Sequence, residues 1–189
     1  MTNSTKIATG LTLIATGVII AMLRRRTDDK PASLIINQKD DMSTNANLPR
    51  GYRNNNPLNV RYSAKNNWLG KVTPNTDRNN AFEQFVTMAY GYRTALYLIR
   101  KYIKSYGCDT LAKIIAKWAP DTENDTSAYI QHVSEMTGIK PSQYISPNNK
   151  DLLCKLAYAM SIVENGNTAE TRAAGLPNMD IIETGYNLL

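Results

Sequence analysis

The sequence predicts a mainly α-helical domain of the α+β class, with a small antiparallel β-sheet. Four segments in the second half of the chain repeat apolar residues at helical spacing. Three short stretches between residues 58 and 85 have the composition and alternation of strands, and turn-forming Asn, Pro and Gly residues separate them. At 189 residues the chain is long enough for one domain plus an appendage.

Four helices are predicted from apolar spacing and from residues that start or stop a helix. The first covers residues 88–106, with Thr87 as N-cap and Gly107 as its stop. The other three are expected at about 111–118, 126–137 and 148–165. From Thr168 onward only one weak helical turn and a polar tail are expected.

The predicted sheet lies between the N-terminal polar region and the first helix. Its strand candidates are residues 58–62, 68–72 and 81–85. An Asn-Asn-Asn-Pro turn at residues 54–57 precedes them, because Asn tolerates left-handed φ and Pro fixes its own.

Residues 7–23 carry no charge and are followed by Arg24, Arg25 and Arg26. This run reaches the short end of a membrane span. A signal peptide would carry its positive charge before the apolar run, so the reverse order favours an uncleaved transmembrane anchor over a signal peptide or a buried helix. The arginines are expected on the cytoplasmic side, or inside a virus particle that contains a membrane. The predicted division is residues 1–26 as membrane anchor, 27–49 as linker and 50–189 as globular domain with a C-terminal tail.

The formal charge of +6 is compatible with an anionic partner such as nucleic acid, a lipid surface or a cell-wall polymer. Nucleic acid is disfavoured, because the globular part has no recognised binding motif and no long basic stripe. Cys108 and Cys154 are expected to be unpaired thiols. His132 is the single histidine, so a zinc site is not expected, and neither a metal nor a cofactor is predicted.

Glutamates and aspartates are the candidate glycosidase groups, because such enzymes need a protonated carboxylic acid and often a second, ionised carboxylate. Glu164 continues the apolar stripe of Ala157 and Met160 at the end of its predicted helix, where burial would raise its pKa. The alternative is an exposed glutamate at a helix end. Asp77, in a turn, and Glu83, in a strand, are weaker candidates for the second carboxylate.

Short motifs occur in a defined order from residue 56 to 98: NPLNVR, WLGK, FEQF and GYRTAL. They resemble the middle of the lysozyme-like N-acetylglucosaminidases of autolysin and flagellar type. The motifs RNNNP, WAP, ENDT and YIQHV are similar to a group of phage and prophage virion proteins thought to have a lysozyme-like fold. The helix that ends in Glu164-Asn165-Gly166 resembles the lytic transglycosylase helix that ends in Glu-Ser-Gly. The resemblance covers about residues 50–166 and implies a lysozyme-like helical domain.

The chain departs from this pattern in one respect. In the glucosaminidases the catalytic Glu closes a helix that precedes the N-L-F-G segment, whereas this chain has no Glu before Glu83. We therefore hypothesise a circular permutation, in which Glu164 reaches the same cleft from the C-terminal side.

A glycan cleft needs aromatic rings for stacking and polar groups for hydrogen bonds. The candidate substrate-binding residues are Asn54, Asn55, Asn56, Arg61, Trp68, Tyr90, Tyr92 and Tyr129. For each of them a purely structural role in the core or in a turn is the alternative.

Together, the residues and the resemblance predict a virion-associated peptidoglycan hydrolase of lysozyme, glucosaminidase or lytic transglycosylase type, with Glu164 protonating the leaving oxygen. The alternative is a non-catalytic, membrane-associated virion structural protein that retains the fold. The expected partners are peptidoglycan, a membrane through residues 7–23, and other virion proteins. The expected location is the virion membrane, and the host cell membrane during assembly.

Overall fold

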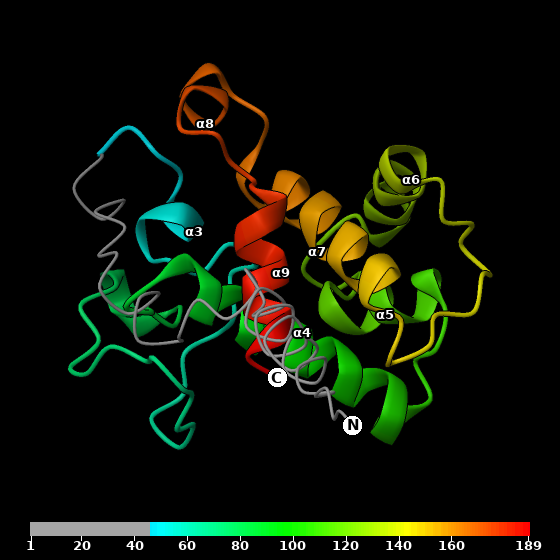
Figure 1. Cartoon of the computed structure of the whole chain (residues 1–189), viewed down its shortest axis with the longest axis horizontal. Coiled ribbons are helices and arrows are strands. Elements are labelled where there is room, and N and C mark those ends of the chain that lie inside the picture. The colour runs from blue at the N-terminus through cyan, green and yellow to red at the C-terminus, as the bar shows by residue number, and fades with distance from the viewer. Residues whose placement is uncertain (1–45) are drawn as a thin grey trace, which may run out of the picture. The chain divides into compact units, whose positions relative to one another are not determined.

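Helices dominate the computed structural model, which describes residues 46–189 (Figure 1). The elements in chain order are α3 (Arg50–Arg53), the 3-10 helix η2 (Arg78–Asn80), α4 (Met88–Tyr106), α5 (Leu111–Trp118), α6 (Thr126–Thr137), α7 (Lys150–Asn165), α8 (Ala169–Ala173) and α9 (Met179–Asn187). The predicted anchor at residues 7–23 and most of the linker lie outside the described residues. Within residues 46–189, no helix has both the length and the apolar character needed to cross a membrane.

The helices α4 to α7 confirm the four helices that the sequence predicts, with boundaries within about two residues. Side-chain oxygens of Thr110, Asp125 and Asn149 accept capping hydrogen bonds at the starts of α5, α6 and α7. Gly107 and Gly138 end α4 and α6 in the left-handed conformation that a helix C-terminus favours. The chain therefore encodes these helix boundaries locally.

The predicted β-sheet is wrong. Residues 46–189 contain no extended strands, and the segments expected to form the sheet meet only at the isolated antiparallel bridges Arg61–Phe82 and Lys71–Phe85. Asn59 and Gly70 have φ values of 50° and 73°, which interrupt the extended backbone that a ladder requires. Side chains complete the pairing instead, as when the Asn75 amide donates to the Phe82 carbonyl oxygen over 2.8 Å.

The predicted C-terminal tail is wrong as well, because α9 packs against α4 and α7 (Figure 1). Ile182 is fully buried. A Cβ atom at Gly185 would lie 2.8 Å from the Ala89 carbonyl oxygen, so the two helices approach each other as closely as glycine permits. The last helix therefore belongs to the core.

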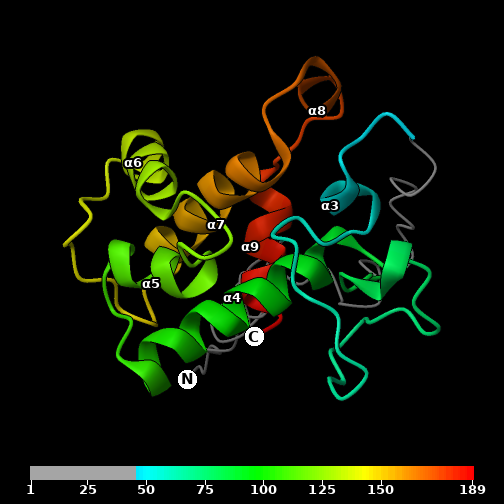
Figure 2. The ribbon, with the colours of Figure 1, turned by 180° about the vertical axis from the view of Figure 1, so that it is seen from behind.

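The core is centred on α4, which runs from the loop region of residues 54–86 to α5 (Figure 2). Leu96 and Ile99 of α4 and Met160 of α7 are inaccessible to solvent. Tyr92 is also fully buried, and its hydroxyl group lies 3.0 Å from the Ser161 hydroxyl of α7. The first long helix thus holds the loop region and the helical part of the domain together.

Shortening Ile182 to alanine tests whether α9 is part of the core. We expect Ile182→Ala to lower the free energy of unfolding by about 2 to 5 kcal/mol, because it removes buried methyl groups and leaves a cavity. Met136→Ala, at a position on α6 that is 44% exposed, is the matched control and is expected to change stability little. Equal denaturant midpoints for the two variants would contradict this packing.

Candidate functional site

The carboxyl group of Glu164 lies where three separate parts of the chain meet. Its Oε2 accepts a hydrogen bond from the Asn59 side-chain amide at 3.0 Å. Its Oε1 accepts hydrogen bonds from Trp118 Nε1 at 3.2 Å and from the Tyr129 hydroxyl at 3.1 Å. All three donors are uncharged, so the carboxyl group has hydrogen bonds without a salt bridge.

Local structure explains how each donor reaches Glu164. Asn59 lies in a tight turn with φ 50°, and its backbone N–H donates to the Asn56 carbonyl oxygen. Trp118 is the last residue of α5, and Tyr129 lies in the first turn of α6. Glu164 is the penultimate residue of α7, so two helix ends, one helix start and a turn converge.

Burial raises the pKa of the Glu164 carboxyl above its ordinary value. The hydrogen bonds from Asn59, Tyr129 and Trp118 and the positive charge of Arg61 lower that pKa, but they do not offset the burial. Burial and the nearby Glu164 charge hold the pKa of Tyr129 well above its usual range, so its hydroxyl stays a donor. Glu164 is therefore a half-buried acid, and the alternative of an exposed glutamate at a helix end is wrong.

An exposed ion pair lies beside this carboxyl group. Arg61 Nη2 is 2.8 Å from Glu123 Oε2, and the two side chains are 69% and 57% exposed. Arg61 follows Asn59 by two residues, and Glu123 belongs to the loop between Trp118 and Tyr129. The pair thus joins the segments that supply the donors to Glu164. Such exposed pairs contribute about 0 to 1 kcal/mol, so a ligand could separate them at little cost.

Asp77 has strong partners of its own in the loop region. Arg50 binds it with two hydrogen bonds, at 2.8 and 2.6 Å, and the Asn54 amide and the Phe82 backbone N–H add two more. Burial alone would raise the pKa of Asp77, but these hydrogen bonds and the Arg50 charge lower it. Asp77 is therefore an ionised structural group, and among the described residues no hydrogen bond joins it to Glu164.

Glu83 is likewise held within the loop region. Its side chain is fully buried, its Oε2 lies 3.1 Å from Lys71 Nζ, and its Oε1 accepts from the Ser63 backbone N–H. The same ammonium group donates to the carbonyl oxygens of Ser63 and Asn66. The structure thus gives both predicted second carboxylates a role in shaping the loop region.

The three consecutive asparagines use their amides inside the protein. Asn55 donates to the Phe85 carbonyl oxygen at 3.0 Å, and Asn56 donates to those of Val60 and Glu83 at 3.0 and 2.9 Å. Asn54, Asn55 and Asn56 are all buried. These hydrogen bonds favour the structural alternative for all three residues.

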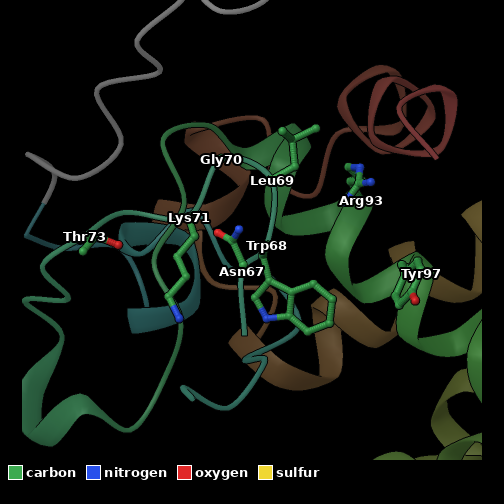
Figure 3. Close-up of a pocket in the computed structure, with 8 residues that line it drawn as sticks. All are labelled: Asn67, Trp68, Leu69, Gly70, Lys71, Thr73, Arg93 and Tyr97. Atoms are coloured by element: carbon green, nitrogen blue, oxygen red, sulfur yellow. The ribbon is translucent and has the colours of Figure 1, made fainter. Parts of the chain in front are cut away.

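The predicted aromatic residues divide into three groups. Tyr129 contacts Glu164 directly, as described above. Tyr92 lies in the core, and Tyr90 is buried against Gly70. Trp68 lines a separate pocket beside α4 (Figure 3). Of the predicted binding residues, the structure therefore brings only Tyr129 and Arg61 close to Glu164.

Sequence reasoning missed two of the three groups that hydrogen-bond to Glu164. The pattern predicts a strand through Asn59, and it predicts Trp118 as the end of a helix and as part of the WAP motif, not as a partner of Glu164. Their positions in short motifs, NPLNVR and WAP, were the available signal. Within residues 46–189, no group of three or more His, Cys, Asp or Glu side chains could hold a metal ion. Cys108 and Cys154 are free thiols.

Comparison with known proteins connects the chain to a bacteriophage. No protein-family model matches it. Protein P5 of Pseudoalteromonas phage PM2 is 36% identical over 122 residues, which cover 65% of this chain and 74% of that protein. The resemblance to phage proteins is thereby confirmed, whereas the resemblance to lysozyme-like enzymes stays a prediction. An identity of this extent over most of both sequences reflects common descent, and the chain belongs to the family of Protein P5 of Pseudoalteromonas phage PM2.

Proposed function

We propose that the protein is a component of a phage particle that cleaves the glycan strand of peptidoglycan, with Glu164 as the general acid. The observation that carries this proposal is the half-buried Glu164 carboxyl, whose pKa burial raises and whose oxygens face three neutral donors. A group of this kind holds its proton at a pH where an exposed glutamate has lost it.

In the proposed reaction Glu164 donates its proton to the glycosidic oxygen that leaves. The carboxylate that remains carries a negative charge in a half-buried position. Hydrogen bonds from Asn59, Trp118 and Tyr129 already point at its two oxygens and need no reorientation to stabilise that charge. The same three hydrogen bonds hold the Glu164 carboxylate in place to accept the proton of the attacking hydroxyl group.

A single-acid mechanism fits this site better than a pair of carboxylates. Asp77 and Glu83 are both engaged in salt bridges within the loop region. A lytic transglycosylase needs no second carboxylate, because a hydroxyl group of the sugar itself replaces water as nucleophile. We therefore favour intramolecular transglycosylation over hydrolysis.

The hypothesis of a circular permutation gains support from the contacts of Glu164. Glu164, near the end of α7, lies 105 residues beyond Asn59 in sequence, and yet the two side chains are hydrogen-bonded. The acid thus meets the Asn-rich turn from the C-terminal side, as the hypothesis requires. The lysozyme-like fold itself remains part of the proposal.

A phage particle with an internal membrane would also accommodate the proposed anchor at residues 7–23. Arginines on the inner side of that membrane would place the domain inside the particle, where it would meet the cell wall on entry. Other virion proteins are then its expected neighbours.

The second candidate is a non-catalytic structural protein of the particle. Two observations favour it: Asp77 and Glu83 are both engaged in ion pairs within the loop region, and residues 1–82 contain no Glu. This candidate predicts that the protein does not cleave peptidoglycan, even where it binds it.

Replacing Glu164 by glutamine tests the proposed acid. We expect Glu164→Gln in the full-length protein to lower the rate of peptidoglycan cleavage by about 100-fold to 10,000-fold, because the amide has no proton to donate at neutral pH. Glu135→Gln, at an exposed position on α6, is the matched control and should retain activity. Mass spectrometry of the products identifies anhydromuramoyl ends if transglycosylation occurs. Full activity in Glu164→Gln would refute Glu164 as the acid, and no cleavage by the wild-type protein at any pH would favour the structural candidate.

Removing the charge of Arg61 tests the electrostatics of the site. We expect Arg61→Met to raise the pKa of Glu164 further, because the positive charge that favours the carboxylate is lost. An acid with a higher pKa stays protonated to higher pH, so the alkaline limb of the activity profile should move up with it. Lys65→Met, which removes an exposed charge outside the site, is the control. Carbon NMR titration of the Glu164 carboxyl measures the pKa directly, and a shift equal to that of the control would refute the assignment.

A further inference from the structure

A cavity with a volume of about 590 Å³ lies between the loop of residues 67–73 and α4. Figure 3 shows the loop side chains on one side and Arg93 and Tyr97 of α4 on the other. The side chains that define it are Asn67, Trp68, Leu69, Lys71, Arg93 and Tyr97. Neither Glu164 nor any of its three donors lines this cavity.

One wall of the cavity is aromatic and reaches the surface. The rings of Trp68 and Tyr97 meet edge to face, with centroids 5.8 Å apart. Tyr97 is 44% exposed, and Leu69, which also lines the cavity, is 51% exposed. Rings held in this way offer an apolar surface with polar edges, which suits the mixed apolar and hydroxylated faces of a sugar.

Of the two cations that line the cavity, Arg93 is the one whose charge can bind a ligand. Its Nε donates to the Leu188 carbonyl oxygen at 2.9 Å, which fixes the guanidinium group, and the two Nη groups have no hydrogen-bond partner among residues 46–189. Lys71, by contrast, is occupied by Glu83 and by the carbonyl oxygens of Ser63 and Asn66. No acidic residue lines the cavity, so a carboxylate is the ligand group that Arg93 would bind.

We propose that this cavity is a second glycan-binding site, which takes a sugar unit bearing a carboxylate. The sugar ring packs against Trp68 and Tyr97, and its carboxylate binds the free Nη groups of Arg93. The choice of muramic acid as that sugar rests on the proposed function, because muramic acid alternates with N-acetylglucosamine along the peptidoglycan strand. The site holds the strand at a place apart from the one where it is cut.

Fluorescence of Trp68 reports on this cavity specifically. The chain has two tryptophans, so the full-length double variant Glu164→Gln, Trp118→Phe retains Trp68 alone and lacks the proposed acid. The probe is a tetrasaccharide of alternating N-acetylglucosamine and N-acetylmuramic acid with free carboxylates, and chitotetraose is its neutral counterpart. We expect the muramic acid tetrasaccharide to change Trp68 emission in a saturable way and to bind at least tenfold more tightly than chitotetraose.

Two substitutions in the same background test the residues. We expect Arg93→Met to weaken binding of the muramic acid tetrasaccharide at least tenfold and to leave binding of chitotetraose unchanged, because the charged contact is lost. Arg93→Lys should recover part of the affinity, and Tyr97→Ala should weaken both ligands. Lys101→Met, an exposed cation on the same helix, is the matched control. Thermal melting of each variant identifies any loss of folding.

Three outcomes would overturn the proposal. The first is an unchanged affinity in folded Arg93→Met and Tyr97→Ala. The second is equal binding of the charged and neutral tetrasaccharides. The third is tighter binding of a glucuronic acid tetrasaccharide, which would assign the cavity to an acidic surface polysaccharide. Cleavage is not measured, so failure of the proposed enzymatic activity and failure of this binding site remain distinguishable.

Discussion

The hydrogen bond between α7 and the Asn-rich turn is the interaction on which the candidate site depends. The buried amide of Asn165 donates to the Pro57 carbonyl oxygen at 2.7 Å and ties together residues 108 positions apart. A Cβ atom at Gly51 would lie 2.3 Å from Asn165 Oδ1, so this approach requires glycine in α3. Because Asn165 is fixed there, the preceding residue, Glu164, must face Asn59.

Two ion pairs with buried carboxylates, Arg50–Asp77 and Lys71–Glu83, hold the loop region together in the absence of a β-sheet among its residues. Asp77 connects Arg50 and Asn54 to the turn at residues 77–82, and Glu83 connects Lys71 to Ser63. Buried charges are tolerable when they are paired and hydrogen-bonded, and removing one partner leaves the other uncompensated. Side-chain contacts thus determine the conformation of the loop region. Its backbone is irregular, and residues 67–73 form one wall of the cavity beside α4.

The sequence was informative where structure is encoded locally. Apolar spacing and capping residues predicted α4 to α7, and the apolar stripe of α7 predicted that Glu164 would be partly buried. The strands and the C-terminal tail were predicted wrongly because both depend on tertiary context. Left-handed Asn59 and Gly70 interrupt the strands, and the short helix α9 packs on α4 and α7, which the spacing of its own few residues did not indicate. The donors to Glu164 could not be paired with it from sequence, since they come from distant segments and each has an ordinary local role.

The spread of the site along the chain has a consequence for biosynthesis. Asn59, Trp118 and Tyr129 leave the ribosome before Glu164, and α9, which packs on α4 and α7, leaves after it. Contacts this far apart in sequence form only after most of the polypeptide has been made and collapsed. A nascent or truncated polypeptide that ends before Glu164 therefore lacks the hydrogen bonds between this carboxyl group and its three donors. The site is complete only after α7 has been synthesised and has packed against the earlier segments.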